Sequence, residues 1–378
     1  MTEATNTPIR VLMLTTILNR GGLESMVMNY YRHIDRSKVQ FDFVVHREQK
    51  GAFEDEIIAL GGKIYRMMPI RPLTFGKYKK QIAQFLDEHP EYQIIHGHLS
   101  ELGYFFYKEA AKRNIPVIIA HAHRSKMPLD LKWIMRTLFK YQMRRYLTHY
   151  FTCGQEAAVW LYGKNKAKLA ITQRNAIETI SFSFHEKNRK RTREEMAIED
   201  STFVVSHVGS FQLSKNHTFL IDVFESIHKQ FPNSILLLIG DGELRKDIEK
   251  KCKELHIEQS VRFLGVRSNV SDLFQASDLL LFPSLFEGLP VTLIEAQCTG
   301  IPCLISDGIP QEVILTDLVT SKSLKDSAVF WAEEALQLRE RNIDRTIYPA
   351  IIKEKGYDIQ KNAEWLQNFY INSLKCQH

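Results

Sequence analysis

Two glutamates eight positions apart are the residues of this chain best placed to do chemistry. Glu287 follows the apolar run 279–282, which predicts a buried strand, and Glu295 lies about two turns along the helix expected next. Between them, Gly288 and Leu289 would expose backbone amides at the start of that helix. Because an ionised carboxylate only accepts hydrogen bonds, this pair predicts recognition of hydroxyl groups, one glutamate on a sugar and the other on a ribose diol.

Loops with glycine follow other predicted strands and suit a phosphate group. One begins with Gly209 and Ser210 and carries Lys215, so backbone amides and one point charge could hold a diphosphate. Gly240 opens a tight turn after the next strand. Two further glycines precede the first predicted helix, whose free amides favour an anion: Gly21 and Gly22. None of these loops has the G-x-G-x-x-G spacing of a nicotinamide dehydrogenase, so that class is disfavoured.

Histidines follow two neighbouring predicted strands. His121 and His123 come directly after the run 116–120. Because alternate residues of an extended segment point opposite ways, we expect only one of them to face a ligand, where it could donate to a sugar hydroxyl or a developing anion. His96 and His98 repeat this spacing, and we expect them to be ordinary polar loop residues. No further metal ligand is evident near His121 and His123, so we expect no metal site.

The elements that must position these loops form a regular series. Short apolar runs alternate with helix-length amphipathic stretches, which predicts α/β domains with parallel sheets covered on both faces. Ligands of such sheets bind beyond the carboxyl ends of the strands, and with two domains we expect the site in the cleft between them. The predicted strands are 9–15, 41–45, 63–66, 94–96, 117–120, 150–152, 203–208, 235–239, 261–264, 279–282 and 302–305.

Composition fits a globular chain of two domains. The chain has 378 residues and a net charge of +6, a mild excess that fits an anionic ligand or membrane surface and does not demand nucleic acid. The five cysteines form no C-x-x-C pair, so we expect free thiols. No apolar run is long enough for a membrane span or a signal peptide, so we expect a cytoplasmic protein. The charged stretch 181–200 predicts a solvated linker between the domains.

One predicted helix carries a row of cations. The stretch 131–146 places Lys132, Arg136, Lys140 and Arg144 at four-residue spacing, with apolar and aromatic residues beside them. A basic helix of this kind can lie on an anionic membrane as a peripheral contact. The alternative, a solvated face over an ordinary core contact, remains open.

Taken in order along the chain, these segments resemble the retaining GT-B glycosyltransferases of family 4, most closely bacterial enzymes of exopolysaccharide and capsule assembly. The pair Glu287 and Glu295 resembles the E-x7-E motif of that family, and the glycine, histidine and lysine loops match in the same order. The resemblance implies two Rossmann-like βαβ domains facing a central cleft. Residues 1–180 would bind the acceptor, 181–355 the nucleotide sugar, and 356–378 would form a helix returning to the first domain.

The resemblance also implies roles for single residues. Glu287 would contact the donor sugar, Glu295 the ribose and Lys215 the diphosphate, with Gly288 and Leu289 offering their amides. The members of the donor-binding set that remain would line the phosphates and the base: Gly21, Gly22, Gly209, Ser210, Gly240, Arg245, Val266 and Arg267. The family usually has an arginine where this chain has Ser210, and Arg245, Arg262 or Arg267 would have to replace its charge.

The implied activity is that of a hexosyltransferase. It would move a sugar with retention of configuration from a nucleotide-diphosphate donor, expected to be a UDP-sugar, to a saccharide acceptor that is expected to be lipid-linked. His121 or His123, Glu287 and Lys215 would serve catalysis, with no metal and no cofactor. Two alternatives remain open: a catalytically impaired nucleotide-sugar-binding partner protein that lost turnover with its arginine, and a GT-B nucleotide-sugar epimerase.

Overall fold

The computed structural model describes residues 7–19, 21–124 and 133–375. They form two compact units, each with its own sheet. The N-terminal unit comprises Met1–Ala176 and Ile359–His378, and the C-terminal unit comprises Ile177–Asp358. The sequence placed the two crossings after residues 180 and 355. In the structure the chain passes between the units after residues 176 and 358, and Ile177 and Asp358 pair in a parallel bridge.

The N-terminal unit is built on a seven-stranded sheet in the order β3-β2-β1-β4-β5-β6-β7. Every pair of neighbouring strands in it is parallel. The strands are β1 Ile9–Leu14, β2 Val39–Val45, β3 Ile64–Arg66, β4 Ile94–Gly97, β5 Val117–Ala122, β6 His149–Thr152 and β7 Ile171–Thr172. The helices are α1 Gly22–His33, α2 Glu54–Ala59, α3 Phe75–Glu88, α4 Tyr104–Lys112, α5 Trp133–Met143, α6 Gln155–Ala167 and α14 Ile359–Lys375.

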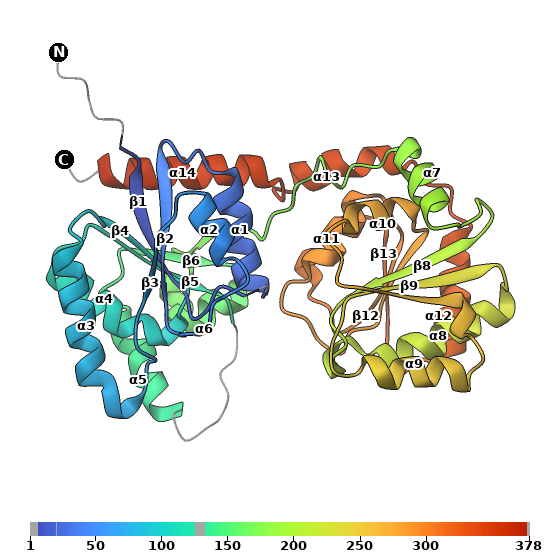
Figure 1. Cartoon of the computed structure of the whole chain (residues 1–378), viewed down its shortest axis with the longest axis horizontal. Coiled ribbons are helices and arrows are strands. Elements are labelled where there is room, and N and C mark those ends of the chain that lie inside the picture. The colour runs from blue at the N-terminus through green and yellow to red at the C-terminus, as the bar shows by residue number, and fades with distance from the viewer. Residues whose placement is uncertain (1–6, 20, 125–132, 376–378) are drawn as a thin grey trace, which may run out of the picture. The chain divides into compact units, whose positions relative to one another are not determined.

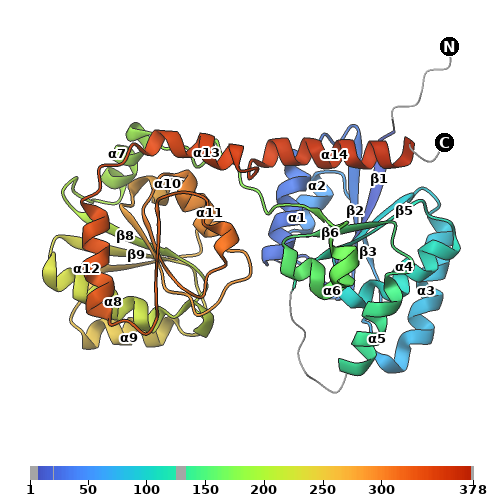
Figure 2. The ribbon, with the colours of Figure 1, turned by 180° about the vertical axis from the view of Figure 1, so that it is seen from behind.

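Alternation along β1 divides the core of this unit in two. Val11 and Met13 pack on the face covered by α1 and α14, whereas Leu12 and Leu14 pack on the face covered by α3 to α6. Apolar side chains on both faces explain why the strands read as continuous apolar runs. The last helix, α14, packs along α1, so the end of the chain completes the first unit (Figure 2).

The C-terminal unit has a six-stranded parallel sheet in the order β10-β9-β8-β11-β12-β13. Its helices cover both faces (Figure 1). The strands are β8 Phe203–Val208, β9 Ser234–Ile239, β10 Val261–Gly265, β11 Leu279–Phe282, β12 Cys303–Ser306 and β13 Val319–Lys322. The helices are α7 Glu186–Glu195, α8 His217–Gln230, α9 Arg245–Glu254, α10 Val270–Ala276, α11 Val291–Cys298, α12 Ala328–Arg339 and α13 Tyr348–Glu354.

The sequence prediction of this fold is confirmed in its strands and wrong in its linker. All the predicted strands are present, and the sequence missed only the short edge strands β7 and β13. The stretch 181–200 is not a solvated linker, because it contains α7, which packs against α10. Arg193 is buried and donates to the carbonyl of Ala276 (2.9 Å), and Arg189 pairs with Asp278 (2.6 Å). Arginines that bind backbone carbonyls at the end of a helix make a charged segment part of the domain.

Candidate functional site

An ion pair joins two of the predicted loops in the C-terminal unit. Lys215, after β8, lies with its Nζ 2.5 Å from Oε1 of Glu287, which follows the neighbouring strand β11. The ammonium also lies 5.2 Å from the centre of the Phe282 ring. The Leu285 amide donates to the Ser214 carbonyl (2.8 Å) and ties the two loops together. A cation and a carboxylate that the sequence predicted in separate loops therefore form an ion pair beyond the carboxyl end of the sheet.

The second glutamate lies in the helix that follows this loop. Gly288 is exposed, and open space surrounds the position where a Cβ would stand. With Leu289 it leads into α11, whose N-cap residue Pro290 offers no side-chain hydrogen bond to the first amides. Glu295 is half-buried in α11, and burial raises the pKa of its carboxyl to about 7. The helix thus presents free amides at its start and a carboxyl group that binds a proton readily within it.

Glycines bring the loops after β8, β9 and β10 into close contact. Gly240 has a φ of +137°, and a Cβ there would collide with the Gly209 carbonyl. The Gly240 amide donates to the Gly265 carbonyl (2.9 Å). Val266 and Arg267 follow directly and are exposed. A side chain at position 240 would prevent this backbone contact, which brings the three adjacent loops together along one edge of the sheet.

The arginines that were expected to replace the missing charge differ in their surroundings. Ser210 is half-buried in the loop that carries Lys215. Arg262 donates to the backbone carbonyl of Met196, so its charge is engaged in holding the fold. Arg245 begins α9, directly after the Gly240 turn, and its Nε donates to Glu249 (2.8 Å). Of these two, Arg245 is the one that a phosphate could recruit by exchange with a surface carboxylate.

Sequence reasoning missed a histidine beneath the lysine loop. His207 in β8 is fully buried, and its Nδ1 donates to the Leu281 carbonyl (2.9 Å). Its Nε2 lies 3.1 Å from where a Cβ on Gly209 would stand. Burial holds the pKa of this imidazole well below its usual value, so the ring is neutral. The one signal in the sequence was a histidine inside a mostly apolar run.

The first glycine loop lies in the N-terminal unit. Gly21 is the N-cap of α1, and Gly22 is its first residue, with open space at its Cβ position. Glu24 in the first turn is half-buried, and burial raises the pKa of its carboxyl. Arg20, of the same loop, lies outside the described residues. The part of Gly21 and Gly22 in donor binding stays a prediction.

Both predicted histidines belong to a larger group, and the reason for expecting only one of them to face a ligand, that they point opposite ways, is wrong. Residues two apart in a strand share a face, so His121 and His123 point the same way and their rings stack 4.0 Å apart. His96 in the neighbouring strand β4 and His98 directly after it are buried beside them, so they are not ordinary polar loop residues. We call these four side chains the histidine cluster.

The histidine cluster is held by two imidazole pairs. His98 Nδ1 lies 2.8 Å from His123 Nε2, and His96 Nε2 lies 3.2 Å from His121 Nδ1. His96 Nδ1 also lies 2.7 Å from the hydroxyl of Tyr370 in α14. Burial lowers the pKa of His96 and of His123 to about 3, so both rings are neutral. His123 is the member with partial exposure and is therefore the one able to meet a ligand.

The helix with the row of cations differs from the prediction. Arg136 lies 3.6 Å from the buried Glu101, and Arg144 donates to the Leu161 carbonyl (2.9 Å). Lys140 lies 4.9 Å from the centre of the Trp160 ring. These cations lie against the unit and do not form a solvated stripe. Lys132, the first cation of the row, lies outside the described residues. The exposed surface of α5 is instead apolar: Trp133, Ile134, Leu138 and Tyr141.

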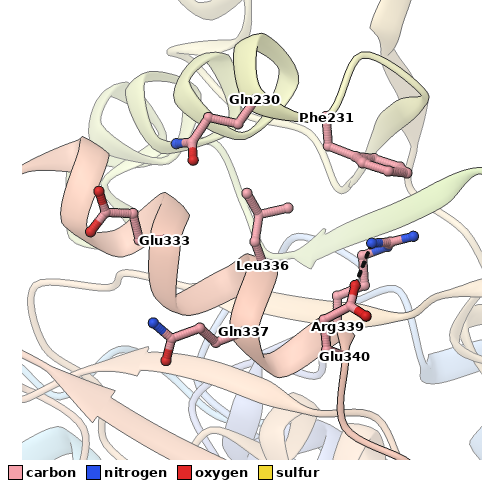
Figure 3. Close-up of a pocket in the computed structure, with 7 residues that line it drawn as sticks. All are labelled: Gln230, Phe231, Glu333, Leu336, Gln337, Arg339 and Glu340. Atoms are coloured by element: carbon pink, nitrogen blue, oxygen red, sulfur yellow. Dashed lines mark hydrogen bonds and ion pairs between the residues drawn. The ribbon is translucent and has the colours of Figure 1, made fainter.

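A surface hollow of about 370 Å³ lies elsewhere in the C-terminal unit (Figure 3). It lies between the end of α8 and α12, next to the amino end of β9. Its lining residues are Gln230, Phe231, Glu333, Leu336, Gln337, Arg339 and Glu340. Parallel α/β sheets bind ligands at the opposite, carboxyl edge, and no predicted site residue lines this hollow. It is therefore separate from the candidate site.

Known families match both parts of the chain. The description "Glycosyltransferase Family 4" matches residues 20–161, and "Glycosyl transferases group 1" matches residues 188–329. The putative glycosyltransferase EpsF of Bacillus subtilis (strain 168) is 31% identical over 98% of both chains. The capsular polysaccharide biosynthesis glycosyltransferase CapH of Staphylococcus aureus is 25% identical over 96% of this chain and 99% of its own.

Solved structures share the fold. The Anabaena protein HepE in complex with UDP aligns with a TM-score of 0.79 at 16% identity, over 96% of this chain and 100% of that one. WaaG, a glycosyltransferase of lipopolysaccharide biosynthesis, aligns with a TM-score of 0.70 at 15% identity, over 96% and 99%. Within the described residues, no helix has the length and apolar character needed to cross a membrane. On its fold and on a relative matched along its full length, the chain is a glycosyltransferase and belongs to family 4 of the GT-B glycosyltransferases.

Proposed function

We propose that this glycosyltransferase moves a sugar, with retention of configuration, from a UDP-sugar to a lipid-linked saccharide in exopolysaccharide or capsule synthesis. The observation that carries the donor class is the ion pair of Lys215 and Glu287 beside the free amides at the start of α11. A cation, a carboxylate and helix amides at one edge suit a sugar attached to a diphosphate. The names of EpsF and CapH support a saccharide product, and the UDP held by HepE supports the nucleotide.

In the proposed complex, the diphosphate displaces Glu287 from Lys215. The lysine and the amides of Gly288 and Leu289 then face the phosphates, while the released carboxylate accepts from the sugar hydroxyls. Glu295 accepts from the ribose diol in its ionised form. The apo ion pair thus keeps both charges paired until the donor arrives, which avoids leaving either one partly buried and alone.

The transfer itself exchanges one bond at the anomeric carbon. The bond from that carbon to the diphosphate oxygen breaks, and the bond to the acceptor oxygen forms on the same face. The leaving diphosphate takes the acceptor proton, so the proposed step requires no enzymic nucleophile and no metal ion. Lys215 and the amides stabilise the charge that develops on the leaving group. His123 would donate to a sugar hydroxyl, since it is the exposed member of the histidine cluster.

A two-stage experiment tests this proposal. Nucleotide sugars are first screened by thermal shift, because a ligand that binds the folded state raises the melting temperature. The donor found is then incubated with lipid-linked saccharides, and the product is analysed for mass and anomeric configuration. A new glycoside that keeps the donor configuration supports the proposal. An inverted product overturns the assigned stereochemistry, and stabilisation by no UDP-sugar overturns the donor class.

Ser210 favours a second candidate, a catalytically impaired nucleotide-sugar-binding partner protein. In that case, the thermal shift would be seen without transfer or hydrolysis. The variant Ser210→Arg separates the two cases. Restored turnover would identify the serine as the cause of the impairment. Lower activity than the parent would instead show that another cation, such as Arg245, already occupies the space beside the phosphates.

Access to a lipid-linked acceptor requires the protein to reach a membrane. We propose a peripheral contact at the inner face of the cell membrane through α5. Ile134, Leu138 and Tyr141 are exposed by 76%, 52% and 56%, and Lys140 and Arg144 lie beside the Tyr141 ring. Apolar side chains next to cations are typical of helices that lie in the interface of an anionic bilayer.

A further inference from the structure

We propose that His96, His98 and His121 bind a transition-metal dication in the N-terminal unit. One nitrogen of each residue lies within 4.8 Å of the others, and all three side chains are buried. The proposal is independent of the donor chemistry, because Lys215 and Glu287 belong to the other unit. The ion would fix the loop that carries His123, and the sugar transfer does not pass through it.

The backbone places these side chains on one face of the sheet. His96 lies in β4 and His98 directly follows its last residue, whereas His121 lies near the end of β5. The strands are parallel, with Gly97 paired to Ala120, so His98 and His121 come next in register. A histidine pair spaced by one residue plus a third histidine on the adjacent strand converge without any long loop. Three imidazoles of this kind make a tetrahedral zinc site when a water supplies the fourth ligand.

Two of the nitrogens in the histidine cluster have no partner. His98 Nε2 and His121 Nε2 are buried and make no hydrogen bond, in side chains that are 6% and 0% exposed. A buried polar atom without a partner destabilises the fold, so atoms of this kind point to a bound water or ion. Two of them on rings whose centres lie 5.2 Å apart favour one shared occupant.

The surroundings support an ion over a water. Tyr370 holds His96 through Nδ1 at 2.7 Å, which leaves Nε2 to coordinate. Partners of this type fix the orientation of a ligating ring. Nitrogen ligands alone suit zinc, cobalt, nickel or copper and do not suit magnesium or calcium. His96 would exchange its 3.2 Å contact with His121 for the ion.

The test is a titration of the full, untagged chain after treatment with a chelator. Co²⁺ is added first, because its visible absorption reports coordination geometry, and Zn²⁺ affinity follows by calorimetry. We expect one ion per chain and the intense bands of tetrahedral Co²⁺. His98→Asn and His121→Asn should each weaken Zn²⁺ binding by at least about 100-fold, and Tyr370→Phe by about 10-fold, since it removes only the support of a ligand.

A matched control comes from the other unit. His217 is buried, and neither of its ring nitrogens makes a hydrogen bond, yet its neighbour His207 is the single other histidine beside it among the described residues. His217→Asn should therefore leave the metal stoichiometry and affinity unchanged. If His121→Asn does not fold, the Zn²⁺ affinities of the parent and of His98→Asn still test the proposal. Zn²⁺ binding by the parent that is no stronger than that of His98→Asn, or octahedral Co²⁺ spectra, would overturn the proposal.

Discussion

Lys215 is the residue whose loss should most reduce turnover. Lys215→Ala removes the charge next to the proposed diphosphate and leaves Glu287 without its 2.5 Å partner. A charge-assisted contact at a partly desolvated phosphate contributes about 2–4 kcal/mol, so kcat/KM should fall roughly 30- to 1,000-fold. Steady-state kinetics on the identified donor measures this. Lys229→Ala is the control, because Lys229 pairs with Glu225 on the surface of α8. If Lys215→Ala keeps the kcat/KM of the parent, Lys215 does not contact the donor.

Glu295 predicts a pH dependence of both stability and nucleotide binding. Its pKa is raised from 4.5 to about 7 in the folded protein. The folded state therefore holds a proton that the unfolded state has released between these values, and stability falls as pH rises from about 4.5 to about 7. The loss is at most about 3.5 kcal/mol, since a tenfold change in the acid dissociation constant corresponds to about 1.4 kcal/mol.

The variant Glu295→Gln should remove this slope and be more stable than the parent at pH 8 in urea titrations. The affinity of the parent for UDP should rise with pH, because the ribose diol requires the ionised carboxylate. Calorimetry should show affinity rising through pH 7 with release of a proton. An unchanged stability slope in Glu295→Gln would mean that another group is responsible. If Glu295→Gln still releases a proton when it binds UDP, a residue other than Glu295 contacts the ribose.

The sequence was informative for residues in loops and less so for residues in strands. Glu287 and Lys215 could be placed together because the carboxyl ends of parallel strands meet at one edge. The histidine cluster could not, because the order of strands decides that β4 lies beside β5. The expectation that the His121 and His123 side chains point opposite ways was wrong, because residues two apart in a strand lie on the same face of the sheet. His207 was missed because a histidine in a mostly apolar strand does not show, from sequence alone, which loop lies above it.

At the scale of elements, α7 offers a test of why a charged segment folds. Arg193 is 1% exposed and bonds to backbone carbonyls, whereas Arg191, on the same helix, is 55% exposed and pairs with Asp272. Arg193→Ala leaves several buried carbonyls without donors and should lower the free energy of unfolding by about 2–4 kcal/mol. Arg191→Ala should cost less than about 1 kcal/mol, as exposed ion pairs do.

Urea unfolding followed by far-ultraviolet circular dichroism measures both variants of α7. Equal midpoints for Arg193→Ala and Arg191→Ala would show that α7 contributes little to the C-terminal unit. The sequence predicted a linker here because composition counts charges and cannot show where they point. The stem of an arginine is apolar, so the residue can be buried when carbonyl groups receive its five donors. The edge strands β7 and β13 escaped prediction for a related reason, since short, half-exposed strands lack a continuous apolar run.

At the scale of the whole molecule, the chain builds two units with the same architecture. Each unit alternates strand and helix, and each reads as α/β from the sequence alone. Composition could not show that the end of the chain returns to the beginning. That return depends on contacts between residues far apart in sequence, such as Tyr370 with His96 and Gln367 with the Asp35 amide. Truncation at the end of the chain should therefore disturb the N-terminal unit, including the histidine cluster.

Membrane attachment is the prediction that involves the molecule as a whole. The exposed residues Ile134 and Leu138 on α5 would enter the interface, each contributing up to about 1.5–3 kcal/mol if fully buried. The cations Lys140 and Arg144 lie at the edge of this apolar surface, where each adds about 1 kcal/mol before screening. We therefore expect sedimentation with anionic vesicles at low salt, weakened by high salt.

Two variants separate the apolar and electrostatic parts of this contact. Ile134→Ser with Leu138→Ser should reduce vesicle binding about tenfold or more at every salt concentration, because its loss is not screened. Lys140→Gln with Arg144→Gln should reduce binding at low salt only. Val329→Ser, on the exposed surface of α12 in the other unit, removes apolar area of similar exposure and should change nothing. If the parent protein stays in the supernatant with anionic vesicles at low salt, α5 does not dock on the membrane, and the acceptor must reach the enzyme by another route.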